Sequence, residues 1–388
     1  MSEVSGDLLG KRNSSIEALK IVAIILIVIS HVVQTLGIKG NAYISYSDYA
    51  VNIQMATKDI QLLIISMLRY CGTIGNTIFF ICSAWFFLDN NRINRKKILV
   101  MIADVWIISV IILSIVFFIE RKIKGSLVIA SFFPILFENN WYINCYLMFY
   151  LLHPILNKVI AALDQRTLFR MTAIMSLMYF VLAFGNRLTA LLFNMGTVFF
   201  ESTIIIWMVI YFLLAYMRKY TRFMDDINVN KFLVSIGLLG SILMVILSNM
   251  LGLKNSIFSE SLLIWNEANN PFIVCFAIGS FNIARSKSFE NKVINYISKL
   301  SLCIYLFHEN RILRNIYRPA MWQYVYTNFG YNNILIWVLV LTLVTALFGL
   351  ISSFVYYESI HKIVTKYSRR LYLSLISMLT KMEKHLMK

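Results

Sequence analysis

The chain has 388 residues and a formal net charge of +17; hydrophobic residues make up 59% of it and charged residues 14%. Ordinary globular chains are roughly 45–50% apolar and about 25% charged, so a soluble domain of this composition would leave a large apolar surface facing water. A soluble enzyme, a disordered chain and a disulfide-built secreted domain are therefore excluded, and a polytopic membrane protein is indicated.

Ten segments of the chain meet or approach the requirement for a membrane-crossing helix, about 20 mostly apolar residues. Barrel strands are a poor alternative because they alternate in polarity and run for only about 10 residues. The ninth segment is the weakest, since it contains Lys299 and Glu309. We therefore predict an all-α polytopic membrane helix bundle. The ten predicted spans cover residues 16–37, 66–88, 98–119, 141–162, 168–186, 201–217, 232–252, 265–284, 293–312 and 333–356.

The basic residues predict the orientation of this bundle. Ten spans place both termini on one side, and that side collects most of the 36 Lys and Arg residues. By the positive-inside rule both termini are cytoplasmic, and this clustering between apolar runs argues against a nucleic-acid partner. We expect a multi-pass protein of the cell membrane; the wealth of Lys, Asn and Ile suits a low-GC bacterium and hence a bacterial plasma membrane.

The chain divides into two parts. Residues 1–360 form a transmembrane domain, and residues 361–388 form a basic, amphipathic tail expected to lie on anionic lipid at the cytoplasmic face. Residues 126–137 are apolar but too few to span, so this segment is either interfacial or re-entrant. The five cysteines lie inside apolar runs without paired spacing, which argues against disulfides and a metal site.

The first span contains two polar side chains on one face. Lys20 and His31 are eleven residues apart, very nearly three helical turns, so they point the same way about 16 Å apart. Ionisable groups inside a membrane are costly and therefore mark candidate sites. A neutral imidazole at His31 can accept a proton from a hydroxyl; the alternative is a histidine that only hydrogen-bonds a neighbouring helix.

The ninth span repeats this arrangement. His308 lies about 15 residues after the predicted cytoplasmic start of its span, which matches the depth of His31 in a helix running the same direction. The two histidines are therefore predicted to flank a single cavity. Ser301 shares the face of His308, and Glu309 is a candidate to orient or charge an imidazole from another helix. The alternative is a polar helix end at the outer interface.

A basic turn follows the second span. Arg92 and Arg95 have the spacing that shares one face if the segment is helical. Paired guanidiniums suit phosphate oxygens, and Lys97 is a candidate for the same role. The alternative is that these residues are ordinary topology anchors.

Trp141 and Tyr142 open the fourth span from the predicted outer side. Aromatic residues there usually form an interface belt, but they also suit stacking on a sugar. Arg69 and Asp104 are buried charges without an evident role, and Arg69 is a candidate substrate-binding residue. His153 is interpreted as structural.

Five short motifs together resemble the integral-membrane acyltransferase type 3 family, which includes bacterial surface-polysaccharide O-acetyltransferases. The motifs run in family order from the first span to the ninth, and ten spans is the family count. The matching residues are Lys20, Ala23, Ile27 and His31; Phe79-Phe80-Ile81-Cys82-Ser83-Ala84; Arg92-Ile93-Asn94-Arg95; Trp141-Tyr142 with Pro154; and Ile304-Tyr305-Leu306-Phe307-His308.

Two positions depart from the family pattern. Lys20 stands where Arg is usual, which keeps the charge but loses bidentate geometry. Ala84 stands where Gly is usual. No esterase-like domain follows the tenth span, so the chain resembles the stand-alone subgroup.

The resemblance implies transfer of an acyl group, most simply acetyl, from cytoplasmic acetyl-CoA to a hydroxyl of a cell-surface or lipid-linked glycan, with no metal. Lys20, Arg92, Arg95 and Lys97 would then hold the CoA phosphates. His31 would act either as general base or as acyl carrier, and His308 with Glu309 would orient it or stabilise the oxyanion.

Two other functions share the same general features. A transporter or flippase of a lipid-linked glycan would also have many spans and buried charges. It often shows inverted repeats with Gly- or Pro-broken spans; no such pair is found, and the chain has only four prolines. A glycan polymerase is a further alternative.

Overall fold

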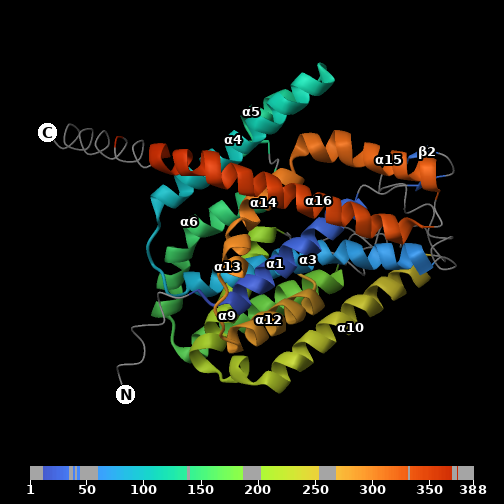
Figure 1. Ribbon diagram of the computed structural model, residues 1–388. Coiled ribbons are helices and arrows are strands. Elements are labelled where there is room, and N and C mark those ends of the chain that lie inside the picture. Colours follow the sequence, from blue (N-terminus) through green and yellow to red (C-terminus); the bar gives the residue numbers. More distant parts are fainter. Residues whose placement is uncertain are drawn as a thin grey trace.

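The computed structural model describes residues 12–34, 38–39, 42–43, 60–137, 140–186, 202–252, 268–330, 333–368 and 374. In this part of the chain eight helices are long and apolar enough to cross a membrane, and Pro271–Ser286 is a shorter apolar helix. The predicted all-α membrane bundle is confirmed (Figure 1).

The elements alternate between long helices and short connecting pieces. The first half contains α1 (Ser14–Gln34), the antiparallel two-residue strands β1 (Ile38–Lys39) and β2 (Ala42–Tyr43), α3 (Ile60–Phe87), α4 (Arg95–Glu120), α5 (Gly125–Phe132), α6 (Trp141–Ala162), α7 (Gln165–Ser176) and the π-helix η2 (Leu177–Ala183). The second half contains α9 (Thr203–Tyr220), η3 (Phe223–Asp225), α10 (Ile227–Gly252), α12 (Pro271–Ser286), α13 (Lys292–Lys299), α14 (Ser301–His308), η4 (Leu313–Tyr317), α15 (Arg318–Phe329), α16 (Ile334–Tyr356) and η5 (Tyr357–His361).

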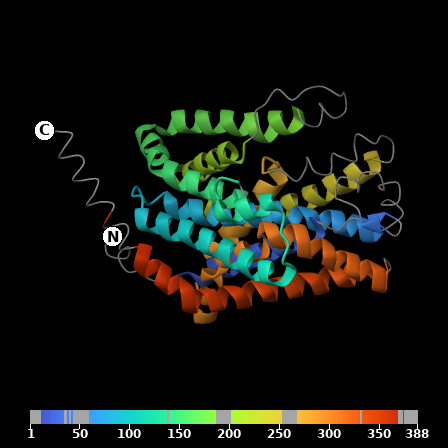
Figure 2. The same ribbon diagram turned by 90° about the horizontal axis from the view of Figure 1, so that it is seen from above.

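Seen from above, most of the long helices run roughly from one side of the molecule to the other (Figure 2), and Figure 1 shows that α10 and α16 cross at an angle. The start of α1 and η5, which directly follows α16, lie at the same end of the bundle, because both are bound to α13. The Ser14 hydroxyl donates to Asn295 Oδ1 at 2.8 Å, and the Tyr296 hydroxyl donates to Glu358 Oε1 at 2.6 Å. We call this the inner end of the bundle.

The predicted ninth span is not one continuous helix, and the prediction is wrong at this point. The chain breaks at Leu300 between α13 and α14 and again after His308. Asn291 fixes the start of α13, since its side chain accepts from two backbone N–H groups, and at Leu300 the backbone N–H bonds to the carbonyls of Ile297 and Ser298, which ends this helix; α13 is polar on one face. Its polar face is satisfied against α1, where the Ser298 hydroxyl donates to Glu17.

The short apolar segment after α4 turns back into the bundle, which makes it re-entrant. The Trp106 indole donates to the carbonyl of Phe132 at 3.1 Å, about 21 Å back along α4 from its outer end. Asn144 of α6 donates to the carbonyl of Ile135 at 2.8 Å. Because of this fold-back, α6 begins inside the bundle rather than at its outer surface.

The last helix continues past the predicted domain boundary at residue 361. His361 Nδ1 lies 3.0 Å from Asp104 Oδ1, and the Tyr356 hydroxyl donates to the same oxygen at 2.7 Å. These bonds give the buried Asp104 its partners and make His361 part of the bundle. The helix runs to Ser368, and apart from residue 374 the rest of the tail lies outside the described residues.

Gly75 lets α1 and α3 approach closely, and its replacement by Val is expected to destabilise the bundle. A Cβ there would lie 2.5 Å from the carbonyl oxygen of Ala23 and 2.7 Å from Ile27 Cγ1, one turn from His31. Overpacking of this kind costs about 1–3 kcal/mol. Thermal unfolding in detergent measures it, with Gly185→Ala as control because nothing lies within 4 Å of its added Cβ. Equal midpoints for both variants would contradict the expectation.

Candidate active site

His31 of α1 and the end of α14 meet in the middle of the bundle. His31 Nδ1 lies 3.1 Å from His308 Nε2 and 2.9 Å from Glu309 Oε2. All three residues are buried, with exposed fractions of 7%, 2% and 3% for His31, His308 and Glu309. The structure therefore brings together the three residues that the sequence singled out as catalytic; their catalytic role remains a prediction.

The hydrogen bonds define which nitrogens carry protons. His308 Nδ1 lies 2.7 Å from the carbonyl oxygen of Ile304, which can only accept, so Nδ1 is the protonated nitrogen of a neutral His308. Its Nε2 is then an acceptor. The proton of His31 Nδ1 is directed to Glu309 and His308, and His31 Nε2 is left with its lone pair. Both contacts of His31 with Glu309 and His308 are made by Nδ1, so Nε2 is the nitrogen that can take a proton.

Two arginines that the sequence did not suggest hold the carboxylate of Glu309. Arg314 Nη1 lies 2.9 Å from Oε1, and Arg318 Nη2 lies 2.9 Å from Oε2. Arg318 Nη2 also donates to the carbonyl of His308 at 2.7 Å. Both arginines lie between the ninth and tenth predicted spans, where charged residues are ordinarily interpreted as part of a loop. The hydropathy pattern therefore gave no indication that they reach the site.

A divalent metal fits this cluster poorly. One ligand atom from each of His31, His308 and Glu309 lies within 4.8 Å of the others. However, both carboxylate oxygens already accept from guanidiniums, whose two positive charges would repel a cation. The one available nitrogen of His308 faces the Nδ1 proton of His31. The arrangement suits proton transfer better than metal binding.

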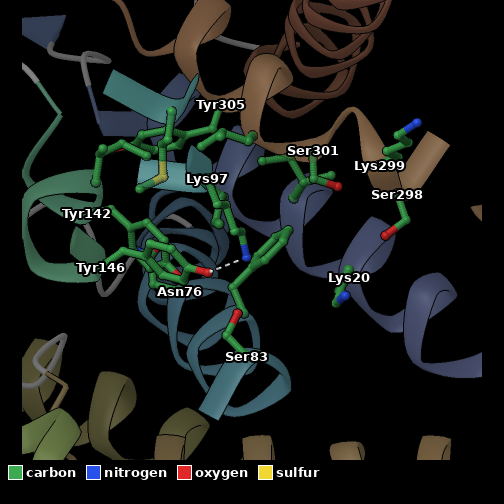
Figure 3. Close-up of a pocket in the computed structure, with 16 residues that line it drawn as sticks. Lys20, Asn76, Ser83, Lys97, Tyr142, Tyr146, Ser298, Lys299, Ser301 and Tyr305 are labelled. Atoms are coloured by element: carbon green, nitrogen blue, oxygen red, sulfur yellow. Dashed lines mark hydrogen bonds between the residues drawn. The ribbon is translucent and has the colours of Figure 1, made fainter. Parts of the chain in front are cut away.

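A cavity of about 290 Å³, with polar and apolar lining residues, lies on the inner side of the histidines (Figure 3). Lys20 of α1, Lys97 of α4 and Lys299 of α13 line it, and we call it the lysine cavity. Lys20 Nζ is 3.3 Å from Glu17 Oε1, and Lys97 Nζ is 3.5 Å from the Tyr146 hydroxyl. Lys20 is ion-paired with Glu17, and Lys299 Nζ lies 4.6 Å from the centroid of the Tyr357 ring, so the three lysines leave a net positive charge at the cavity that suits an anionic ligand.

Tyr305 and Ser301 lie between the lysine cavity and the histidines. Both line the cavity, and their buried hydroxyls have no hydrogen-bond partner among the described residues. The Tyr305 ring centroid is 6.4 Å from that of His31 and 5.9 Å from that of His308. His31 does not line the cavity itself; Ile27, one turn before it, does. Tyr305 therefore separates the cavity from the imidazole.

The other predicted site residues lie in different places. Arg92 and Arg95 are exposed at the inner end and do not line the lysine cavity, and Arg92 precedes α4, so the two share no helical face. Tyr142 lines the cavity beside Tyr305, at 6.0 Å between ring centroids, rather than lying at an outer interface, because α6 begins inside the bundle. Trp141 points outward and is 39% exposed.

Arg69 lies near the outer end of α1. The Ser30 hydroxyl donates to its carbonyl oxygen at 2.8 Å, one residue before His31. With the Gln34 amide turned so that its oxygen faces Arg69, that oxygen accepts from Nη2 at 2.7 Å. Arg69 thus supports α1 beside the imidazole, and its substrate-binding role remains a prediction.

The fold and the site together define a multi-pass membrane protein with a buried histidine–carboxylate pair next to a cation-lined cavity. The family model described as "Acyltransferase domain" matches residues 13–353. The chain belongs to this family, the integral-membrane acyltransferase type 3 family. No curated protein and no solved structure matches the chain.

Proposed function

We propose that this protein transfers an acetyl group from cytoplasmic acetyl-CoA to a hydroxyl of a cell-surface or lipid-linked glycan. The observation that carries the proposal is the position of His31, bonded to Glu309 and His308 and close to Tyr305, which lines a cavity together with three lysines. Membership of the acyltransferase family supports the acyl-transfer reaction itself. The donor, the acetyl group, the glycan and the bacterial plasma membrane are our proposal.

The lysine cavity is the proposed site for the thioester arm of the donor. Its volume of about 290 Å³ is too small for a whole coenzyme, so the nucleotide and its phosphates stay at the inner rim. Lys20, Lys97 and Lys299 neutralise the phosphates, and Arg92 and Arg95 extend this basic rim at the surface. To reach His31 the thioester passes the Tyr305 side chain.

The reaction needs one proton to move and one acyl bond to be exchanged. His31 Nε2 takes the proton of the acceptor hydroxyl as its oxygen attacks the thioester carbonyl. Glu309 stabilises the imidazolium that results, and the Tyr305 hydroxyl donates to the oxyanion. The C–S bond then breaks, the ester C–O bond remains, and the imidazolium returns its proton to the leaving thiolate.

The direct test is mass spectrometry of surface glycans from cells with and without this protein, combined with acetyl-CoA turnover by the purified protein in vesicles. We expect acetyl esters only when the protein is present, and free CoA in proportion to them. Movement of a lipid-linked glycan without any release of CoA would favour the transporter instead.

Replacing Lys97 or Lys299 by Gln is expected to raise the KM for acetyl-CoA about tenfold and to leave kcat nearly unchanged, because each residue contributes one charge to donor binding at an open cavity. Arg92→Ala combined with Arg95→Ala should weaken donor use similarly. Initial rates against donor concentration measure both. Lys158→Gln serves as control because Lys158 is an exposed lysine outside the cavity; an unchanged KM in every variant would contradict the donor site.

A further inference from the structure

A second cavity, of about 400 Å³, lies on the opposite side of the histidine pair from the lysine cavity. Helices α4 and α16 form its walls, and η4 and the start of α15 close one end. We call it the outer groove. Its lining is almost entirely aliphatic and aromatic, apart from Thr345, His308 and Arg318. It therefore meets the active site at His308.

The outer groove opens sideways from the bundle at membrane depth. Four side chains along it are strongly exposed: Ile115 (53%), Ile119 (65%), Val344 (48%) and Phe348 (44%). They belong to helices that cross the membrane, so these surfaces face hydrocarbon rather than water. A hydrocarbon chain reaches the groove from the bilayer without crossing water, whereas a free glycan would bury its hydroxyls against apolar side chains at a high cost.

Arg318 supplies the second, independent observation. The residue lines the outer groove and is only 7% exposed, and its Nη1 has no hydrogen-bond partner in the part of the chain that the structure describes. A buried charged donor without a partner is costly, so Nη1 requires an oxygen acceptor. Glu309 balances only one of the two guanidiniums of Arg314 and Arg318. The excess positive charge favours an anionic oxygen, as in a phosphate.

These two observations require one ligand with two parts. A hydrocarbon chain packs against the apolar walls of the groove, and a phosphate oxygen accepts from Arg318. The acyl chain of a long-chain donor would fill the walls but would bring no oxygen to Arg318 beyond its reacting carbonyl. We propose that the outer groove binds the hydrocarbon chain of a phosphate-bearing lipid that carries the acceptor glycan, with the phosphate at Arg318. This inference rests on the proposed function and narrows its acceptor to the lipid-linked form.

The test is photolabelling of the full-length protein in phosphatidylcholine vesicles with a diazirine analogue of farnesyl phosphate. We expect labelled peptides to contain residues 112–119 and 344–348. Unlabelled farnesyl phosphate should compete at least tenfold better than farnesol, which lacks the phosphate. Ile115→Trp and Val344→Trp fill the groove and should reduce labelling at least tenfold. Leu339→Trp is the matched control, since Leu339 is 65% exposed on α16 outside the groove.

Arg318→Gln should make farnesol and farnesyl phosphate compete equally. Equal competition already in the wild-type protein, or labelling that Ile115→Trp and Val344→Trp leave unchanged, would overturn the proposal and leave the groove to bulk bilayer lipid. Preferential competition by decanoyl-CoA would assign the groove to the donor instead and would also overturn it. Labelling does not depend on turnover, so acetyl-CoA hydrolysis in the same vesicles tests the proposed function separately.

Discussion

Replacement of His31 by Ala is expected to reduce kcat for acetyl transfer by about 10²–10⁴-fold, the usual contribution of a positioned general base. The protein should still fold, because Glu309 keeps both of its arginine partners when the imidazole is removed. His31→Gln should be equally inactive, since an amide keeps a hydrogen-bond donor toward Glu309 but has no basic nitrogen. Steady-state rates on detergent-solubilised protein, normalised to folded protein, measure the loss.

His153→Gln is the matched control for His31. His153 is also fully buried in a membrane-crossing helix, where its ring lies 4.8 Å from that of Phe87 and its Nδ1 is 2.6 Å from the carbonyl of Tyr150. It lies away from the site, so its loss should lower stability and leave kcat unchanged. Normal acetylation by His31→Ala at normal expression would reject the mechanism. Parallel double-reciprocal plots for the wild type would instead make His31 an acyl carrier.

The depth of the two histidines was predictable because the rise of a helix is fixed. His31 and His308 each lie a similar number of residues from the inner end in helices that run the same way, and helical geometry then places them at one level. The structure adds that their nitrogens are 3.1 Å apart. Contact between two particular rings depends on helix rotation and tilt, which the close approach at Gly75 helps to set and which no local pattern reports.

Three further features that could not be predicted depend on reversals or breaks of the chain inside the membrane. Tyr142 lines the lysine cavity because the segment before α6 turns back. The sequence of an aromatic pair at a helix start is the same whether that start lies at the membrane interface or inside the bundle. Arg318 reaches His308 because the chain folds over after α14. Lys299 lines the cavity because α13 ends at Leu300 and lies against α1. Hydropathy describes straight spans, so it predicted an interface position for Tyr142, a loop for Arg318 and a single continuous span for the segment that contains Lys299.

Glu309→Gln tests whether the carboxylate acts through His31. The amide oxygen still accepts from His31 Nδ1 at the position that the carboxylate occupies, 2.9 Å away, but it carries no charge to stabilise an imidazolium. Because the hydrogen bond is kept and only the charge is lost, kcat is expected to fall about 10²–10³-fold, the usual loss when one preorganised electrostatic contact is removed. The KM for acetyl-CoA should stay unchanged, since Glu309 does not line the lysine cavity.

Measuring the free energy of unfolding beside kcat separates this catalytic role of Glu309 from a merely structural one, in which kcat per folded molecule would not change. Glu309→Gln leaves two guanidiniums without a counter-charge, and loss of one partner of a buried ion pair costs about 3–5 kcal/mol. Glu309→Asp keeps the charge and should recover part of kcat as well as stability. Glu358→Gln is the control, because Glu358 bonds Tyr296 and Lys362 away from the histidines. If Glu309→Gln kept full kcat per folded molecule, the carboxylate would serve only to hold the arginines, and His31 would need another partner to stabilise its positive charge.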